Sequence, residues 1–347
     1  MTVIHFMYVF AGKYLPESFS GAHMPVSHDE IVQGYRFLLG RDPESEDVIN
    51  MHASACEDVA EFRRRLWGSA EFLVKAVAVA PNAAGSRPLP LSLPANEIEA
   101  DISREQLTQC LAKVKQAWTH LGLTKPHWSV LVAERYLPEN LEARLDEFWE
   151  SSESDLRNIH AIAARHGFNL NRNTTVVEYG CGVGRVTTKL AQRFGRVHAY
   201  DISANHLHLA QEHAKQLGID TIAFHECADQ PLAALEKCDL FFSCIVFQHN
   251  PPPIIKELTR LALESLNVGG LAIFQIPTYA IDYRFNLDDW LSKDDHLSMQ
   301  MHVLPQHHVF EVARETGCEV LEVREDECTG QRDKYVSNTF VIRKPGK

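Results

Sequence analysis

Short apolar runs and amphipathic segments alternate along the chain from residue 174 to residue 343. The apolar runs are rich in β-branched and aromatic residues and predict strands at 174–179, 196–201, 221–225, 239–246, 271–277, 318–324 and 335–343. Between them, apolar residues at helical spacing predict helices over 184–194, 204–217, 251–266 and 305–316. This alternation predicts a doubly wound α/β fold with a seven-stranded, mostly parallel sheet that ends in an antiparallel hairpin.

The first 80 residues follow a different pattern, which is typical of helices. Ser27 and Glu30 form a Ser-x-x-Glu capping box ahead of one amphipathic segment, and residues 57–77 have the spacing of a second. We expect an all-helical module over 1–80, a linker rich in Pro, Ala and Ser over 81–100, a helical arm or lid over 101–166, and the α/β core over 167–347. The module either joins copies of the chain into a homo-oligomer or packs as a structural hairpin.

Composition and charge narrow the classes of function. The 347 residues carry 46 acidic and 34 basic side chains, and this net charge of −12 disfavours nucleic acid as a partner. Eight scattered cysteines without a Cys-x-x-Cys pair are typical of a reducing compartment. The opening MTVIHFMYVFAG lacks the basic start and the length of a secretory signal, so we expect a buried first element there. No run is long enough for a membrane span, and the protein is predicted to be cytoplasmic.

The turn after the first predicted strand, GCGVG at residues 180–184, is the first candidate for chemistry. Its spacing is G-x-G-x-G, whereas a dinucleotide-binding turn is G-x-G-x-x-G and would need a glycine in place of Arg185. Glu178, at the strand end, would repel a pyrophosphate but suits a ligand with an amino group. Asp201, at the end of the next strand, suits the two hydroxyls of a ribose. A cationic nucleoside without phosphate, such as S-adenosylmethionine, fits this set of residues.

Four motifs in register resemble those of the class I S-adenosylmethionine-dependent methyltransferases, namely VVEYGCGVGR, HAYDIS, CDLFFSCIVFQH and LNVGGLAIFQIP. The resemblance covers roughly residues 155–345 and implies S-adenosylmethionine as the cofactor. It places Glu178 at the methionine end and Asp201 at the ribose. The backbone approaches the ligand at Gly180, Gly182 and Gly184. The other residues expected at the cofactor are Ile202, Glu226, Cys227 and Asp229, the last three in the segment FHECADQP that would wrap the adenine.

A narrower resemblance concerns the acceptor. PHWSVLVAERYLPENLEARLDEFWESSESDL, DISANHLHLA and MHVLPQHHVFEVARETGCEVLEV together resemble a bacterial group of these enzymes associated with polysaccharide and glycan modification. YRFLLGRDPE and EFRRRLWGSAEF resemble a helical module attached to polysaccharide-related proteins. These resemblances imply O-methylation of a saccharide hydroxyl. Two alternatives stay open, a methyltransferase for a small hydroxylated or amino metabolite and a non-catalytic scaffold that binds the cofactor.

Methyl transfer to a hydroxyl benefits from a proton acceptor. His249, in FQHNPP after the fourth predicted strand, is the candidate general base, because an imidazole titrates near neutral pH. The alternative interpretation is a histidine that caps the next helix or lines the pocket. Trp128, in PHWSVL, is either a lid over the cofactor or an aromatic anchor for the helical arm.

Residues 278–302 form a long polar and aromatic segment, in a place where such folds carry acceptor-binding insertions. Tyr279, Tyr283, Arg284 and Trp290 suit a saccharide, since they offer apolar faces for stacking and donors for hydroxyls. The acidic residues and histidines of the segment lack a diagnostic ligand spacing, so a solvated loop without a metal is the favoured interpretation. The predicted acceptor is a saccharide or another small molecule.

Overall fold

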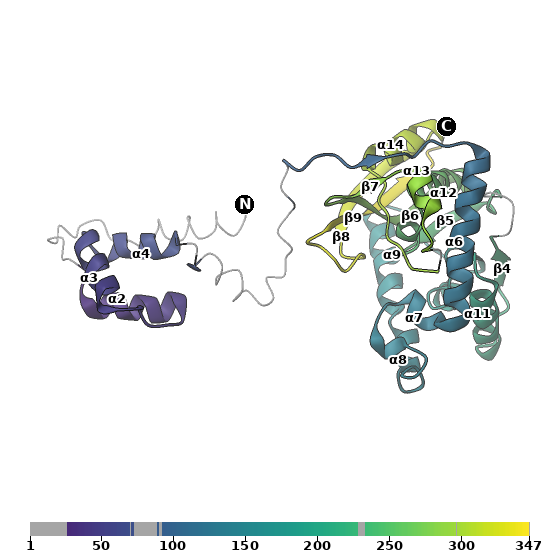
Figure 1. The fold of residues 1–347 in the computed structure, drawn as a ribbon. Helices are drawn as coiled ribbons and strands as arrows, with labels where there is room; N and C mark the ends of the chain where they lie inside the picture. The colour runs from purple at the N-terminus through teal and green to yellow at the C-terminus, as the bar shows by residue number, and fades with distance from the viewer. Residues whose placement is uncertain are drawn as a thin grey trace. The chain divides into compact units, whose positions relative to one another are not determined.

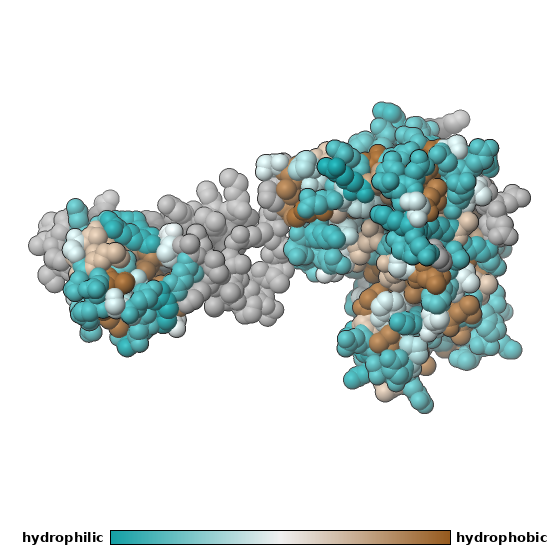
Figure 2. All heavy atoms as spheres, viewed as in Figure 1, coloured by the Kyte–Doolittle hydropathy of each residue, from teal (hydrophilic) through white to brown (hydrophobic). Residues whose placement is uncertain are grey.

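The structure is a computed structural model that describes residues 26–69, 71–72, 89, 92–227, 233–295 and 297–346. The chain divides into two compact units, Met1–Ser86 and Arg87–Lys347, which are described separately. The predicted first element, residues 1–12, lies outside the described residues, as does part of the predicted linker. On the face drawn in Figure 2, the described residues of both units are mostly hydrophilic, with small apolar patches. Within the described ranges, no helix combines the length and the apolar content that a membrane crossing needs.

The described part of the first unit consists of short helices around a small apolar core (Figure 1, purple). These are α2 (His28–Gly34), the π-helix η1 (Tyr35–Leu39), α3 (Glu46–Ala55) and α4 (Val59–Trp67). The predicted capping box is present, because Ser27 Oγ accepts the Glu30 N–H and the Glu30 carboxylate accepts the Ser27 N–H. The core consists of Val26, Ile31, Tyr35, Leu39, Ile49, Cys56, Phe62 and Leu66.

The second unit contains a seven-stranded sheet with the order β4-β3-β2-β5-β6-β9-β8. The strands are β2 (Thr175–Tyr179), β3 (Arg196–Asp201), β4 (Ile222–Glu226), β5 (Cys238–Ser243), β6 (Leu266–Ala280), β8 (Glu319–Asp326) and β9 (Tyr335–Arg343). The first five strands in this order are parallel, and β9 is antiparallel to both of its neighbours. The predicted α/β fold with a seven-stranded sheet and a final antiparallel hairpin is confirmed.

Helices cover both faces of the sheet (Figure 1). The described α-helices of the second unit are α6 (Arg104–Thr124), α7 (Pro126–Val130), α8 (Leu145–Glu150), α9 (Glu153–Arg165), α10 (Thr187–Arg193), α11 (Ala204–Gln216), α12 (Pro252–Ser265), α13 (Leu287–Ser292) and α14 (Gln306–Glu315). Successive strand residues face opposite sides. Val177 and Phe274 pack with α6, α12 and α14, whereas Val176 and Ile273 pack with α9 and α10. This two-sided burial explains the apolar runs of the central strands β5 and β6.

Two strands differ from the prediction by three or more residues at an end. The strand predicted over 239–246 ends at Ser243, because Ile245 adopts a φ of 59° and the chain turns into the 3₁₀ helix η4 (Phe247–His249). The strand predicted over 271–277 extends over Leu266–Ala280, because the last strand pairs with it as far as Ala280. Both differences come from contacts with distant parts of the chain, which a local pattern does not contain.

The end of the predicted linker is fixed to the second unit. β1 (Glu97–Ile98) pairs in parallel with β7 (Arg284–Phe285) in a separate two-stranded sheet. The Asn96 side chain donates to the carbonyls of Ala280 and Tyr283, at 2.7 and 3.1 Å. Residues 96–98 therefore form part of the second unit's structure, and they bring the start of the arm to the segment predicted to bind an acceptor.

Candidate cofactor and acceptor site

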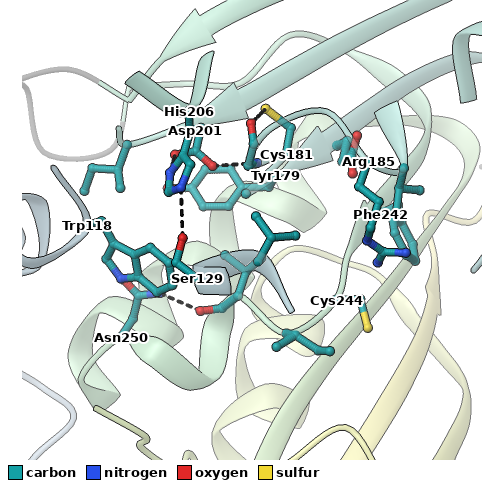
Figure 3. Close-up of a pocket in the computed structure, with 18 of the residues that line it drawn as sticks. Trp118, Ser129, Tyr179, Cys181, Arg185, Asp201, His206, Phe242, Cys244 and Asn250 are labelled. Carbon is teal, nitrogen blue, oxygen red and sulfur yellow. Dashed lines mark hydrogen bonds and ion pairs between the residues drawn. The ribbon is translucent and has the colours of Figure 1, made fainter. Parts of the chain in front are cut away.

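A pocket lies at the carboxyl ends of β2, β3 and β5, where open parallel sheets bind their ligands (Figure 3). Its walls come from the glycine turn after β2, the first residues after β3, the loop after β5, and helices α6 and α7 of the arm. Of the residues predicted at the cofactor, Glu178, Gly180, Gly182, Asp201 and Ile202 line this pocket. We call it the cofactor pocket.

The glycine turn brings the backbone to the surface of the cofactor pocket. Gly180 and Gly182 have φ of 78° and 55°, in the left-handed region that favours glycine. A Cβ on Gly182 would lie 2.6 Å from a methyl group of Val130, and a Cβ on Gly180 would collide with Val246. Gly184 does not line the pocket, and a Cβ there would lie 3.0 Å from the Cβ of Ala210 on α11. The first two glycines shape the pocket, and the third allows a helix to pack closely.

Glu178, at the end of β2, has an unmet hydrogen-bonding need. The residue is only 4% exposed, and burial raises the pKa of its carboxyl to about 8. Its Oε2 atom has no hydrogen-bond partner among the described residues. Buried polar atoms are nearly always paired in folded proteins, so this oxygen marks the place of an absent donor. An ammonium group in the pocket would supply that donor and favour the ionised carboxylate.

Asp201 holds the turn and presents acceptors to the pocket. Its Oδ2 accepts the Gly182 N–H at 2.8 Å, and its Oδ1 accepts the Ser203 N–H at 2.9 Å. Each carboxylate oxygen has two lone pairs, so both keep the capacity to accept a further hydroxyl. His206 Nδ1 lies 3.6 Å from Oδ1, and His206 Nε2 lies 3.0 Å from Ser129 Oγ. This buried chain of groups, visible in Figure 3, links the arm to the carboxylate.

The arm supplies an aromatic wall through Trp118, which the sequence analysis did not name. Trp118 of α6 lines the cofactor pocket, with its ring 5.4 Å from that of His249 and 6.4 Å from that of His206. Trp128 does not line it; the Lys125 ammonium lies 5.3 Å from its ring. The helical spacing of apolar residues could have indicated Trp118, because this tryptophan adjoins the buried face of α6. That face consists of Cys110, Val114, Ala117, Leu121 and Gly122.

The structure describes only part of the segment that is predicted to wrap the adenine. Cys227 donates its N–H to the Asp201 carbonyl at 2.8 Å, but neither it nor Glu226 lines the cofactor pocket. Glu226 instead pairs with Lys115 of α6 at 3.3 Å. Asp229 lies outside the described residues. The described part of this segment therefore braces the arm and β3, while its predicted contacts with the cofactor stay predictions.

His249 lies beside the cofactor pocket, not in its lining. Its Nδ1–H donates to the Gln300 carbonyl at 2.8 Å, so the lone pair is on Nε2, which lies 3.2 Å from the amide nitrogen of Gln248. Burial lowers the pKa of His249 to about 4, against the opposing hydrogen bond to Gln300. The imidazole is therefore neutral at pH 7 in this conformation. Its role as a general base stays a prediction.

A second pocket lies beyond His249, on the side of β1 and β7. A small cavity lined by Trp118, His249, Trp290 and Gln300 separates the two pockets. It shares Trp118 with the cofactor pocket, and it shares Trp290 and Gln300 with the second pocket. The three spaces thus lie next to one another and have these side chains as common walls. We call the outer one the acceptor pocket, because it contains most of the residues predicted to bind an acceptor.

Hydrogen bonds fix the polar and aromatic groups of the acceptor pocket. Tyr283 OH lies 2.8 Å from His302 Nδ1, and the Trp290 indole N–H donates to Gln300 Oε1 at 2.6 Å. Burial lowers the pKa of His302 to about 3, so this imidazole is neutral at pH 7. Arg284 also lines the pocket. Tyr279 does not, since its hydroxyl donates to the Pro94 carbonyl at 2.9 Å.

The charged groups of the cofactor pocket fit a cationic ligand without phosphate. Glu178 and Asp201 are acidic side chains, and the one basic side chain among the described lining residues that carries a fixed charge, Arg185, is paired with Asp155 at 2.8 Å. Elsewhere in the described part of the chain, His, Cys, Asp and Glu do not gather in a group of three or more that could hold a metal ion. The unpaired Glu178 oxygen, the left-handed glycines and Asp201 together match the ammonium, the backbone approach and the ribose of S-adenosylmethionine.

The chain is similar to known methyltransferases. Residues 176–270 match the family model described as a methyltransferase domain. The chain is 26% identical to the ubiquinone biosynthesis O-methyltransferases of Methylococcus capsulatus and Idiomarina loihiensis, over 135 and 137 residues. These stretches cover 36% of this chain and 55% and 54% of the relatives, so the chain spans about half the length of the curated relatives it matches.

A similar solved structure is the magnesium protoporphyrin IX methyltransferase of Synechocystis with bound S-adenosylmethionine. It is 15% identical, with a TM-score of 0.45, and the match covers 71% of this chain and 99% of that one. The family match falls on the strands and turns that form the cofactor pocket. Residues 176–270 therefore belong to a methyltransferase domain. S-adenosylmethionine is the cofactor that the residues of the pocket fit.

Proposed function

We propose that the protein transfers the methyl group of S-adenosylmethionine to a hydroxyl group of a saccharide or glycan. The observation that carries the proposal is the series of three spaces that share walls at Trp118, Trp290 and Gln300. An acceptor held in the outer pocket would reach toward the cofactor through the cavity beside His249. The cofactor supplies an electrophilic methyl group, and the protein aligns the acceptor oxygen with it.

The lining of the acceptor pocket supports a polyhydroxylated ligand. Tyr283 and Trp290 offer aromatic surface, while Glu99, Asn286 and Asp289 offer carboxylate and amide groups for hydroxyls. Ligand pockets typically combine such apolar surface with a few placed polar groups. This combination favours a neutral sugar ring, which has apolar faces and a rim of hydroxyl donors.

We propose that His249 removes the proton of the acceptor hydroxyl. As the oxygen bonds to the methyl carbon and the carbon–sulfur bond breaks, the oxygen becomes positively charged and its proton becomes strongly acidic. A neutral imidazole accepts such a proton even when burial holds its pKa near 4. Its protonatable atom is Nε2, because Nδ1–H is committed to the Gln300 carbonyl. Gln248, whose amide lies 3.2 Å from Nε2, would orient the ring.

A second candidate function is O-methylation of a small hydroxylated metabolite. It is favoured by the names of the two curated relatives, which are O-methyltransferases of ubiquinone biosynthesis. The same cofactor pocket serves both functions, because the fold does not determine the acceptor. The two candidates differ in the size of the molecule that carries the new methyl group.

The test is to incubate the protein with an extract of the source cells and S-adenosylmethionine carrying a radioactive methyl group. The products are separated into polysaccharide, lipid-linked, protein and small-molecule pools. Label in the polysaccharide or lipid-linked pool supports the glycan proposal, whereas label confined to the small-molecule pool overturns it in favour of the second candidate. Asp289→Asn, in the acceptor pocket, should reduce labelling, and the matched control Leu297→Ala, in the same segment but outside the pocket, should not.

A further inference from the structure

Two cysteines from distant parts of the chain meet beside the cofactor pocket. The Sγ atoms of Cys244 and Cys328 lie 3.9 Å apart although the residues are 84 positions apart, and both side chains are half-buried. All eight cysteines lie within the described residues, and this is the one pair among them whose sulfur atoms are in contact. The methyl transfer proposed above uses neither thiol.

Cys244 belongs to the wall of the cofactor pocket, next to Ile245 and Val246. The backbone on both sides of it is fixed. The Ser243 hydroxyl donates to the Tyr179 carbonyl at 2.9 Å, and the Ile245 N–H donates to Gln275 Oε1 at 3.1 Å. Ile245 adopts a φ of 59°, which is strained for a β-branched residue and persists only where the surroundings enforce it. A displacement of Cys244 therefore changes the shape of the pocket.

Cys328 belongs to the turn between β8 and β9, residues 327–334. Its N–H donates to Asp326 Oδ1 at 3.0 Å, while Glu327, Gly330 and Gln331 of the same turn are exposed. The turn can therefore move together with the Cys328 sulfur atom. The hydrogen bond with Cys244, together with burial, raises the pKa of Cys328, so this thiol keeps its proton at neutral pH.

We propose that Cys244 and Cys328 form an oxidative modification site, at which hydrogen peroxide converts the two thiols into a disulfide that weakens cofactor binding. First, the Cys244 sulfur attacks the peroxide; a sulfur–oxygen bond forms, the oxygen–oxygen bond breaks, and the leaving hydroxide takes the Cys244 proton to form water. The Cys328 sulfur then attacks the Cys244 sulfur; the disulfide forms, the sulfur–oxygen bond breaks, and the leaving hydroxide takes the Cys328 proton. The peroxide gains two electrons, each sulfur loses one, and two water molecules result.

The geometry connects this reaction to the cofactor. A disulfide bond is about 2.05 Å long, so the two sulfurs must approach each other by about 2 Å. The exposed turn at Cys328 supplies part of this movement, and the rest displaces Cys244 between its fixed neighbours. Because such coupling is reciprocal at equilibrium, a bound cofactor opposes the disulfide by the same factor by which the disulfide weakens the cofactor.

The experiment uses the full chain, oxidised with hydrogen peroxide and then freed of it. Peptide mapping should find the Cys244–Cys328 cross-link. Isothermal titration with S-adenosylhomocysteine should give a Kd raised by about tenfold. Dithiothreitol should restore the Kd of the reduced protein, and S-adenosylhomocysteine added before the peroxide should reduce the yield of the cross-link.

Two variants serve as controls. Cys328→Ser, outside the cofactor pocket, should bind S-adenosylhomocysteine like the reduced protein, and its Kd should not respond to peroxide. Cys318→Ser, which removes another half-buried cysteine, should respond like the original chain. The proposal is overturned if no cross-link forms, if the cross-linked protein binds with an unchanged Kd, or if Cys328→Ser loses affinity on oxidation as the original chain does.

Discussion

The cofactor pocket and the acceptor pocket are built in different ways. The floor of the cofactor pocket comes from one stretch, residues 178–206, and depends on strand ends and left-handed glycines. The acceptor pocket joins residues 97–99 to residues 283–302, and its contacts with the arm depend on side chains such as Lys113, which donates to the Trp290 carbonyl at 2.6 Å. Cofactor binding therefore depends on local backbone geometry, whereas the proposed binding of the acceptor depends on long-range contacts.

The largest expected effect is on the cofactor side. Asp201→Ala removes the acceptor of the Gly182 and Ser203 N–H groups along with the proposed ribose contacts. Hydrogen bonds to a charged group contribute about 1.5–3 kcal/mol each, so the affinity for S-adenosylhomocysteine should fall by roughly a hundredfold or more. Isothermal titration measures this loss. An affinity within about tenfold of the original protein would place the main cofactor contacts elsewhere.

The second largest effect is expected from a substitution of His249, which lies between the two pockets. His249→Gln should lower methyl transfer by about a hundredfold, because it removes the proposed proton acceptor. Cofactor affinity should not change, since His249 does not line the cofactor pocket. The measurements are labelling of the extract and titration with S-adenosylhomocysteine. Labelling that stays near the original rate would show that another group, or water, takes the proton.

A pH dependence should follow from the buried Glu178 carboxyl. Its pKa of about 8 keeps it protonated at pH 7, and the cofactor ammonium favours the ionised form, so binding releases a proton. Affinity should therefore rise between pH 6 and pH 8, by at most about tenfold per pH unit. Titrations across this range, in buffers of different ionisation enthalpy, measure both the slope and the released proton. The Glu178→Gln variant should not show this pH dependence of cofactor affinity.

The same carboxyl should affect stability in the opposite direction. Without the cofactor, folded Glu178 has a pKa of about 8, above its ordinary value of 4.5, so the folded state holds a proton that the unfolded state releases between these values. The stability that it contributes is complete below about pH 4.5 and is lost as pH rises through 8. Thermal unfolding from pH 5 to pH 8 should show this loss, and Glu178→Gln should reduce it.

The smallest expected effect is on the acceptor side. Asp289→Asn keeps the size of an exposed side chain of the acceptor pocket and removes its charge. The loss of one hydrogen bond of about 1 kcal/mol should weaken the use of the acceptor about fivefold. Labelling of the extract at several protein concentrations measures this change. Cofactor affinity should be unchanged. If labelling of the acceptor and affinity for the cofactor both fell, the two pockets would not be independent.

The contrast between local geometry and long-range contacts also explains how much of the fold and of the site can be predicted from the sequence. Glu178 and Asp201 both line the cofactor pocket, because each lies at the end of an apolar strand and parallel strands end at a common edge. Their contacts with the cofactor stay predictions. Trp118 was missed because its position depends on how α6 packs across the sheet. Gly184 has the predicted spacing but serves helix packing. A spacing identifies the turn, and only the folded chain shows which of its glycines approach a ligand.

Long-range pairing accounts for the other differences. β5 ends early because the Ile245 N–H bonds to Gln275 on the neighbouring strand. The pairing of residues 97–98 with 284–285 joins segments that no local pattern connects. The series of spaces from the cofactor pocket to the acceptor pocket could not be predicted for the same reason, since its shared walls come from residues 118, 290 and 300.

The place of β9 in the sheet has a consequence for synthesis on the ribosome. Tyr335–Arg343 is made after the other six strands of the sheet, yet it lies between β6 and β8 and is the strand that holds β8 in the sheet. While residues 335–343 are still inside the ribosome, the nascent chain has an unpaired β6 edge and a β8 segment without a partner. Such edges attract other chains, so a nascent-chain chaperone should stay bound until residues 335–343 have left the ribosome and paired with β6 and β8.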